Sequence, residues 1–541
     1  MKTKLLSQLV SLITVLVGLQ SAAQAPTLGN AIEFVIFSRN GAVTSDVTNS
    51  LMTHITGNVG TNSSGATSTG FGNVNGVMND DNIASQLASA DVLLAYEQLN
   101  ALIPNFFPSS LLGSGATLTA GTYFINSGAS LDGELILDGQ NNTNALFVFQ
   151  IQGAFSTSAL SKITLINGAK SCNVFWKVEG LVDMSSGTEM KGTVVANNAA
   201  ILMDINGKLD GRLFSTTGAI TVNGITAKLP LGCARPALNG PVAPNLGSTV
   251  CYALFSGNQN VINDGVTFVT GDVGTNVGIT AGFNQANVTG TIHPNPNTST
   301  AQCAADLINV YTYLNTLPIE IELLYPAQFG NNLLLTPHAY LLNAATVLTN
   351  NLYLDAEGNA NAVFTINIYG AFSTSTNAKV ILLNGAQAQN VYWKVDGVVA
   401  INGFSEFIGT LVANNAAINV AAGSIVTGRM LTTNGALTTF AMAITMPVGC
   451  TSLGLTDVSP LDSNPVGMIY PNPFATSFEI KLSDTNTSAD FYLYNTIGEL
   501  VYQEVINDTN TTIRADVATG IYFYKLIGAT GLVQIGKLLS K

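Results

Sequence analysis

Short runs in which apolar and polar residues alternate make up the chain from about residue 145 onward, and Gly or Asn separates one run from the next. Alternation of this kind predicts β-strands with one buried face. Equivalent runs return at intervals of about 20 residues or slightly more, which is typical of a parallel β-solenoid. The predicted first strands of successive coils are 144–151, 173–178, 192–196 and 212–215, and the predicted second strands are 154–158, 181–185, 200–204 and 219–223.

A helical period interrupts this pattern once in each half of the chain. In the first half it spans 81–103 and is carried by Ala84, Leu87, Ala88, Leu94, Ala95 and Leu102; in the second half it is carried by Ala304, Leu307, Ile308, Tyr311 and Leu314. This spacing predicts one amphipathic helix per half, packed along the solenoid. Val148, Phe175 and Tyr392 point outward from the first strands and are too apolar to face water, so we expect the helix to cover that face.

The two halves are copies of one another. GAFSTS at 153–158 recurs at 370–375, NVFWKV at 173–178 recurs as NVYWKV at 390–395, and VANNAAI at 195–201 recurs unchanged at 412–418, always with the same offset in numbering. We therefore predict two homologous solenoids, at 26–233 and 248–450. The segment between them, 234–247, holds Pro236, Pro241 and Pro244 and is predicted to be a semi-rigid linker.

The first 25 residues have the pattern of a secretory signal peptide. Lys2 and Lys4 precede a short apolar run, and Ala23-Gln24-Ala25 fits a cleavage site. Export permits disulfides among the five cysteines, none of which forms a CxxC pair. A Cys172–Cys233 bridge and one pair among Cys251, Cys303 and Cys450 are compatible with this pattern, and the odd count leaves at least one thiol unpaired or intermolecular.

Charge is sparse along the whole chain. Charged residues make up 9% of the sequence, apolar residues 47%, and the formal net charge is −13. Nucleic acid is excluded as a partner because phosphate binding needs clustered Lys and Arg, and no apolar run beyond the leader is long enough for membrane insertion. Disorder is excluded as well, since disordered chains combine low hydrophobicity with high charge.

Several motifs of the two copies resemble the bacterial and fungal ice-binding protein family. They are GNVGTN at 57–62, Gly121-Thr122-Tyr123, the NVFWKV strand, GTVVA at 192–196 and Gly211-Arg212. The resemblance implies an all-β dominated fold of two right-handed parallel β-helices (solenoids), each discontinuous and each with a flanking α-helix. It also implies ice as the ligand.

The C-terminal segment resembles another family. Tyr470-Pro471-Asn472-Pro473-Phe474 opens it, and Gly520-Ile521-Tyr522-Phe523-Tyr524 is a strand near its end. It is similar to the sorting domain of the type IX secretion system, a small C-terminal β-sandwich. We therefore expect a linker at 451–467, a sorting domain at 468–541, the type IX machinery as a partner, and a secreted or outer-surface location.

A solenoid face suits ice because neighbouring strands lie about 4.8 Å apart and alternate side chains of one strand about 7 Å apart, which gives a flat lattice. The second-strand face is our candidate because its outward positions are small. In the second copy these are Ser373, Ser375, Ala400, Asn402, Asn419, Ala421 and Thr438, and in the first copy they are Ser156, Ser158, Ser185, Thr221 and Asn223. Asp183, Leu202 and Asp204 interrupt the first copy, whereas we expect the face of the second copy to be free of charge and to bind ice more strongly.

Other functions remain alternatives. A polysaccharide-cleaving enzyme needs clustered acids and bases, but the strands are nearly bare of them. His54, His293 and His338 are scattered near turns, and each is interpreted as a surface or turn residue and not as a catalyst. We predict no catalytic residues, no metal site and no cofactor. Lys177/Lys394 and Arg212/Arg429 are interpreted as scaffold charges, the arginines bonding backbone carbonyls or an acid. A cell-surface adhesin or a glycan-binding solenoid is the alternative to a free ice-binding protein, and the sequence gives no indication of the oligomeric state.

Overall fold

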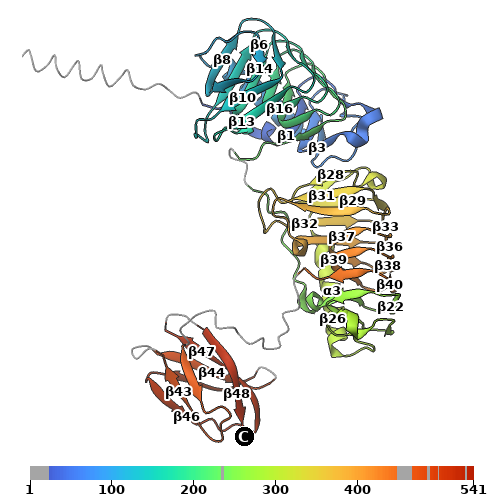
Figure 1. Cartoon of the computed structure of the whole chain (residues 1–541), viewed down its shortest axis with the longest axis vertical. Coiled ribbons are helices and arrows are strands. Elements are labelled where there is room, and N and C mark those ends of the chain that lie inside the picture. Colours follow the sequence, from blue (N-terminus) through green and yellow to red (C-terminus); the bar gives the residue numbers. More distant parts are fainter. Residues whose placement is uncertain (1–23, 233–236, 448–465, 484–487, 497–498, 530–532) are drawn as a thin grey trace, which may run out of the picture. The chain divides into compact units, whose positions relative to one another are not determined.

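A computed structural model describes residues 24–232, 237–447, 466–483, 488–496, 499–529 and 533–541. The chain forms two compact units, one up to Cys450 and one from Thr451 onward. The first unit holds two β-solenoids, whose strands are stacked in ladders with a helix alongside (Figure 1). The predicted solenoid fold with one helix per copy is confirmed. The predicted signal peptide falls largely outside the described residues.

Each coil of the first solenoid contributes strands to two parallel sheets. A seven-stranded sheet runs in the order β2(Val43–Ser45), β19(Ile220–Val222), β17(Ile201–Met203), β15(Val182–Met184), β12(Phe155–Thr157), β9(Ala129–Asp132), β6(Leu111–Gly113). The first and third strands of the coils share a thirteen-stranded sheet, made of β1(Phe34–Ser38), β3(His54–Thr56), β4(Asn58–Thr61), β5(Met78–Asp80), β7(Ala116–Thr119), β8(Gly121–Ile125), β10(Glu134–Asp138), β11(Phe147–Ile151), β13(Lys162–Ile166), β14(Val174–Val178), β16(Glu189–Ala196), β18(Lys208–Ser215) and β20(Thr226–Lys228).

The second solenoid repeats this arrangement. Its seven-stranded sheet has the order β25(Thr280–Ala281), β22(Val261–Asp264), β40(Leu437–Phe440), β38(Ile418–Val420), β36(Val399–Ile401), β33(Phe372–Thr374), β30(Thr346–Leu348). The fourteen-stranded sheet contains β21(Tyr252–Ser256), β23(Phe268–Thr270), β24(Asp272–Thr275), β26(Val288–Thr289), β27(Ile321–Glu322), β28(Leu333–Leu335), β29(Ala339–Leu342), β31(Asn351–Asp355), β32(Phe364–Ile368), β34(Lys379–Leu383), β35(Val391–Val395), β37(Glu406–Ala413), β39(Ile425–Thr432) and β41(Ala443–Thr445).

Strand order differs from chain order at one end of each solenoid. β1 pairs with β18, which lies almost at the other end of the domain sequence, and β2 pairs with β19. In the second copy β21 pairs with β39 and β22 with β40. The N-terminal coil therefore closes onto the last coil of the repeat series, in agreement with a discontinuous solenoid.

Inward residues stack directly on one another from coil to coil. Phe149 pairs with Trp176 in register, and their rings lie 3.9 Å apart and nearly parallel. Tyr123 continues the column on the other side, 5.1 Å from Phe149. The indole nitrogen of Trp176 donates to the carbonyl of Lys191 at 3.0 Å, so the polar atom of the indole is satisfied. Burial of these large rings is a major stabilising contribution to the domain.

The two helices, α2(Ile83–Ala101) and α3(Thr298–Thr316), begin at matching capping boxes. The Asn82 side chain accepts from the Ser85 amide while the Ser85 hydroxyl accepts from the Asn82 amide, at 2.9 Å each, and these bonds fix the start of α2. The buried side of α2 packs on the outward residues of β11, β14, β16 and β18, among them Val148 and Phe175. The prediction that the helix covers the first-strand face is confirmed, and the helix is shorter than the predicted 81–103.

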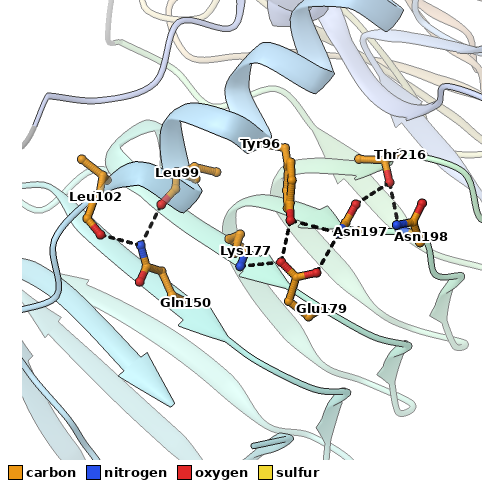
Figure 2. Close-up of polar contacts among 9 residues, drawn as sticks. All are labelled: Tyr96, Leu99, Leu102, Gln150, Lys177, Glu179, Asn197, Asn198 and Thr216. Carbon is orange, nitrogen blue, oxygen red and sulfur yellow. Dashed lines mark hydrogen bonds and ion pairs between the residues drawn. The ribbon is translucent and has the colours of Figure 1, made fainter. Parts of the chain in front are cut away.

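A buried ionic cluster fastens α2 to the sheet. The ammonium of Lys177, whose side chain is 1% exposed, pairs with Glu179 and lies 5.6 Å over the ring of Tyr96. Figure 2 shows Glu179 also accepting from the Tyr96 hydroxyl at 2.7 Å and from the Asn197 amide at 2.7 Å. Burial is the largest influence on the pKa of both Tyr96 and Glu179. It raises the pKa of Tyr96 to about 12, and the Glu179 carboxylate adds to this rise. In Glu179 burial is outweighed by the bonds from Lys177, Asn197 and Tyr96, which lower its pKa.

The same cluster recurs in the second copy with one exchange. Lys394 pairs with Asp396, Tyr311 donates to Asp396 at 3.0 Å, and the Asn414 amide donates to Tyr311 at 2.9 Å. Lys394 also lies 4.1 Å from the centre of the Tyr369 ring. These lysines are thus paired anchors of the helix, a role that their isolated position in the sequence did not reveal.

The duplicated arginines bind backbone, as expected. Arg212 donates from Nε and Nη2 to the carbonyl of Ile32, at 3.0 and 2.8 Å. Arg429 does the same to Val250, at 3.2 and 2.9 Å. Each arginine thereby ties the segment before the N-terminal strand to the last long strand of the repeat.

Of the cysteines, Cys172 and Cys251 are disulfide-bonded and Cys303 is a buried free thiol on α3. Burial raises the pKa of Cys303, which disfavours its thiolate. The predicted partner of Cys172, Cys233, lies outside the described residues.

The C-terminal unit contains two antiparallel sheets. One has the order β42(Gly467–Tyr470), β43(Phe478–Leu482), β46(Asn510–Ile513), and the other β45(Leu500–Ile506), β44(Ala489–Tyr494), β47(Gly520–Gly528), β48(Val533–Ser540). Phe478, Phe491 and Leu526 are among the apolar residues buried in one core, so the predicted β-sandwich is confirmed. Within the described ranges, neither helix is long and apolar enough to cross a bilayer.

The ionic cluster leads to a stability prediction. Glu179→Gln leaves the Lys177 ammonium buried without its carboxylate, and we expect the free energy of unfolding to fall by about 2–3 kcal/mol at pH 7, since Glu179 is partly exposed. Because folding lowers the pKa of Glu179, its contribution is present above the ordinary glutamate pKa of about 4.3 and is lost as the pH falls through the folded value. Denaturant titrations should therefore give nearly the same free energy of unfolding for wild type and variant at low pH.

The exposed Lys208–Glu189 pair provides a control, because Glu189→Gln removes a salt bridge whose side chains are 66% and 41% exposed. Almost no change in stability is expected for it. Equal losses from Glu179→Gln and Glu189→Gln would contradict the anchoring role.

Candidate functional site

The two seven-stranded sheets each present two columns of outward side chains. One column comes from the middle of each strand and the other from the residue at or just after its end, because side chains two positions apart share a face. Figure 1 shows β33, β36, β38, β40 and β22 of the second solenoid stacked along one edge. These columns contain all twelve residues selected from the sequence.

In the second solenoid the columns are mostly small and uncharged. The register gives Val347, Ser373, Ala400, Asn419, Thr438, Ile262 and Ala281 as the first column. The second column follows as Thr349, Ser375, Asn402, Ala421, Phe440 and Asp264. Of the predicted residues of this copy, Asn402, Asn419 and Thr438 are exposed, and Ser373, Ser375, Ala400 and Ala421 are half-buried between neighbouring strands.

The sequence-based expectation of a charge-free face in the second copy is wrong. Asp264 is exposed at the end of β22, and β22 lies next to β40 in this sheet. Ile262 and Phe440 also belong to the face and were missed. For Asp264 and Ile262 the cause is the out-of-order coil: β22 precedes the regular repeats in the chain, so the repeat pattern gives no signal that it extends their sheet. Phe440 lies on β40, within the regular repeats, and is the counterpart of Asn223, so the repeat offset could have identified it.

The first solenoid carries more charge on the equivalent face. Its first column is Leu111, Ser130, Ser156, Asp183, Leu202, Thr221 and Thr44, and its second column includes Asp132, Ser158, Ser185, Asp204, Asn223 and Asp46. Four aspartates therefore stand on this sheet, against one in the second copy. Hydrogen bonds from the backbone and side chain of Thr48 lower the pKa of Asp46 and favour its charged form.

Hydrogen bonds between neighbouring strands hold several of these side chains. Thr438 donates to Asn419 at 2.5 Å, and Thr44 bonds Thr221 at 3.1 Å. The Asn402 amide donates to the carbonyl of Thr374 at 2.5 Å, which fixes its position at the corner of the coil. Side chains held in this way keep one rotamer, so the lattice of the face is preorganised.

A shallow trough of about 340 Å³ runs between the two columns of the second solenoid. Ala400, Asn419 and Thr438 line one side, and Asn402, Ala421 and Phe440 line the other. The strands themselves form the floor, so the trough is as regular as the sheet beneath it. Its walls present methyl groups, amides and hydroxyls to water, with Asp264 as the one charged residue among the lining residues.

Catalytic chemistry has little support in the rest of the described structure. Among the residues described, no group of three or more His, Cys, Asp or Glu is placed to hold a metal ion. His54 lies at the start of β3, and His293 is buried in the loop between β26 and α3, with Nδ1 at 2.8 Å from the Asn297 amide. His338 contacts Thr336 at 3.2 Å inside the second solenoid.

Comparison with known proteins agrees with this architecture. Residues 42–228 and 255–445 match the family described as Ice-binding-like. The chain belongs to this family. Residues 468–541 match the secretion system C-terminal sorting domain, which marks the chain for secretion or for the outer cell surface.

Individual relatives support the same assignment. An ice-binding protein of Nostoc sp. (strain HG1) is 34% identical over 246 residues, 43% of this chain and 87% of the relative. Ice-binding protein 1 of Shewanella frigidimarina is 29% identical over 255 residues, 42% of this chain but only 28% of that protein. The crystal structure of an ice-binding protein from an Antarctic Flavobacteriaceae bacterium is 58% identical, with a TM-score of 0.77 over 79% of this chain and 99% of that one.

The exposed positions of the face lead to a prediction on stability. Thr438 and its counterpart in the first copy, Thr221, lie at equivalent places in the outward columns. Thr438 is exposed and Thr221 is half-buried, and each loses one hydrogen bond to a neighbouring side chain, Asn419 or Thr44. We therefore expect Thr438→Tyr to change the free energy of unfolding by less than about 0.5 kcal/mol and Thr221→Tyr by less than about 1 kcal/mol, because Tyr suits a strand. Thermal unfolding followed by circular dichroism measures both changes, and a large drop for Thr438→Tyr would contradict its exposed placement.

Proposed function

We propose that this chain is an exported ice-binding protein and that it adsorbs to ice through the outward columns of its second solenoid. The observation that carries the proposal is the lattice of Ala400, Asn419 and Thr438 with Asn402 and Ala421 beside them, which are small and uncharged and stand in register on neighbouring strands. Strand and side-chain spacings of about 4.8 and 7 Å are comparable with oxygen spacings in ice. Membership of the ice-binding-like family supports the choice of ligand.

The difference in charge is the reason that we assign ice binding to the second copy and not to the first. An exposed carboxylate keeps its own hydration shell, whose geometry is set by the ion and not by the lattice. The first copy has four such groups on the face and the second has one, at the end of the column. Ser156, Ser158, Ser185, Thr221 and Asn223 then contribute a weaker surface.

No catalytic activity is proposed, and the duplicated basic residues of the described strands are engaged as anchors. Lys177, Lys394, Arg212 and Arg429 each have structural partners. The adhesin alternative differs from the free ice-binding protein only in whether the chain stays attached after sorting. A glycan-binding role receives no support from the relatives, whose names refer to ice.

A matched pair of substitutions tests the face. Thr438→Tyr places a bulky ring in the centre of the second copy's lattice, and Thr221→Tyr places the same ring in the first. We expect Thr438→Tyr to abolish most of the thermal hysteresis and of the inhibition of ice recrystallisation by the intact chain, and Thr221→Tyr to reduce them much less. Greater loss from Thr221→Tyr would overturn the assignment to the second copy, and crystals left unshaped by the wild type would overturn ice binding itself.

A second experiment tests export. Removing residues 468–541 should leave the two solenoids folded, because they form a unit separate from the sorting domain. In a host with a type IX secretion system, the truncated chain should accumulate inside the cell envelope, whereas the intact chain should reach the surface or the medium. Immunoblots of cell fractions measure the distribution, and equal release of both chains would refute a sorting role.

A further inference from the structure

The linker between the two solenoids fills a groove of the second one. The Asn359 amide donates to the Leu238 carbonyl at 3.0 Å and to the Asn239 side-chain oxygen at 2.9 Å. The backbone amide of Val363, just before β32, donates to the Asn239 carbonyl at 2.9 Å. A Cβ on Gly240 would lie 1.9 Å from the Val363 carbonyl oxygen, so the linker backbone touches the groove directly at this point.

The first solenoid has the same groove, and there it is open. A cavity of about 500 Å³ is lined by Ala120, Gly121, Asn142, Asn144 and Leu146, which are the counterparts in the repeat of Pro337, His338, Asn359, Asn361 and Val363. The end of helix α2 and the segment after it, including Ile103, form the other wall. Ile103 is 87% exposed, which is costly for so large an apolar side chain.

Matching hydrogen bonds show that the two grooves have the same construction. The Thr122 amide donates to the Asn105 side chain at 2.7 Å, as the Ala339 amide does to Glu320 at 2.8 Å. The Asn142 side-chain oxygen accepts from the Asn144 amide at 3.0 Å, as Asn359 does from Asn361 at 3.0 Å. Both asparagines are thus held in one orientation, with the side-chain amide of Asn359 directed to the linker.

The chain itself explains why only one groove is filled. Gly247 and Gly29 open equivalent short helices, with φ of 52° and 48°, and the following amides bond Asp306 and Asp91. Counting back from these glycines, Leu238–Gly240 would correspond to residues 20–22. Those residues lie outside the described part and within the expected signal peptide, so cleavage at the expected site leaves the mature chain with no segment of its own at this position.

We propose that the groove of the first solenoid is an acceptor for an extended peptide segment of another polypeptide, of the same kind as the linker. The segment must present a carbonyl to the Leu146 amide, an acceptor to the Asn142 amide, and glycine where Gly240 stands. A main-chain bond to the amide just before β11 and the bond from the Asn142 side chain supply affinity, as the counterparts Val363 and Asn359 do for the linker, and the glycine requirement supplies selectivity. The groove lies beside the end of α2, on a different face from the seven-stranded sheet, so an occupant leaves the ice-binding columns uncovered.

The probe is a fluorescein-labelled synthetic peptide with the sequence of residues 237–247, added to the intact mature chain. We expect saturable binding by fluorescence polarisation at one site per chain, because the second groove is already occupied. We also expect slower hydrogen exchange of the Leu146 amide when the peptide is present. A peptide carrying Gly240→Val should fail to bind, since its side chain would overlap the groove backbone.

Asn142→Asp tests the acceptor side. Aspartate keeps the oxygen that caps the turn at Asn144 and removes the amide donor, so folding is preserved while peptide affinity should fall at least about tenfold. Gln152→Ala, an exposed position outside the groove, should bind as the wild type does. Absence of saturable binding up to millimolar peptide, equal binding of the two peptides, or unchanged affinity of Asn142→Asp would each overturn the proposal.

Discussion

The stacking of one coil on the next, in register, is the constraint on which the structure depends. Parallel hydrogen bonding fixes the distance between coils, and inward residues must then fill the same space at every level. Phe149 over Trp176 illustrates the requirement, because their rings meet at 3.9 Å with the strands in register. Once the inside is fixed, the outward side chains inherit the same two-dimensional order. A regular surface is therefore a by-product of a well-packed interior.

Most of this architecture could be predicted from the sequence, because alternation and duplication report directly on buried faces. The strands of the repeated coils, the covering helices and the terminal β-sandwich follow from such patterns. Asp264 and Ile262 could not be assigned to the face, since β22 joins the sheet by pairing with β40, a strand at the opposite end of the copy's sequence. The pairing of Lys177 with Glu179 and Tyr96 could not be predicted either, because Tyr96 lies on helix α2, far from Lys177 in the sequence.

The two copies have kept their interior and diverged on their surface. The ionic anchor under the helix survives with Asp396 in place of Glu179, and both arginines still bind the carbonyl of the preceding segment. Outward positions have changed freely, from Asp183 and Leu202 to Ala400 and Asn419. Packing tolerates few substitutions whereas solvent-facing positions tolerate many, so duplication gave one scaffold two surfaces of different character.

The out-of-order coil also has a consequence for the time at which the protein folds. Arg212 and its contact Ile32 are 180 residues apart, and β1 obtains its partner β18 only when nearly the whole copy exists. Contacts over such separations are slow to form, because the entropy of closing a long loop is lost before the contact contributes any stabilisation. The first coil therefore has both of its neighbours, β4 and β18, only after the last long strand of the copy has been made. Completion of this end of each solenoid thus waits for the end of that copy's sequence, whereas the coils from β6 to β17 need only their neighbours in the chain.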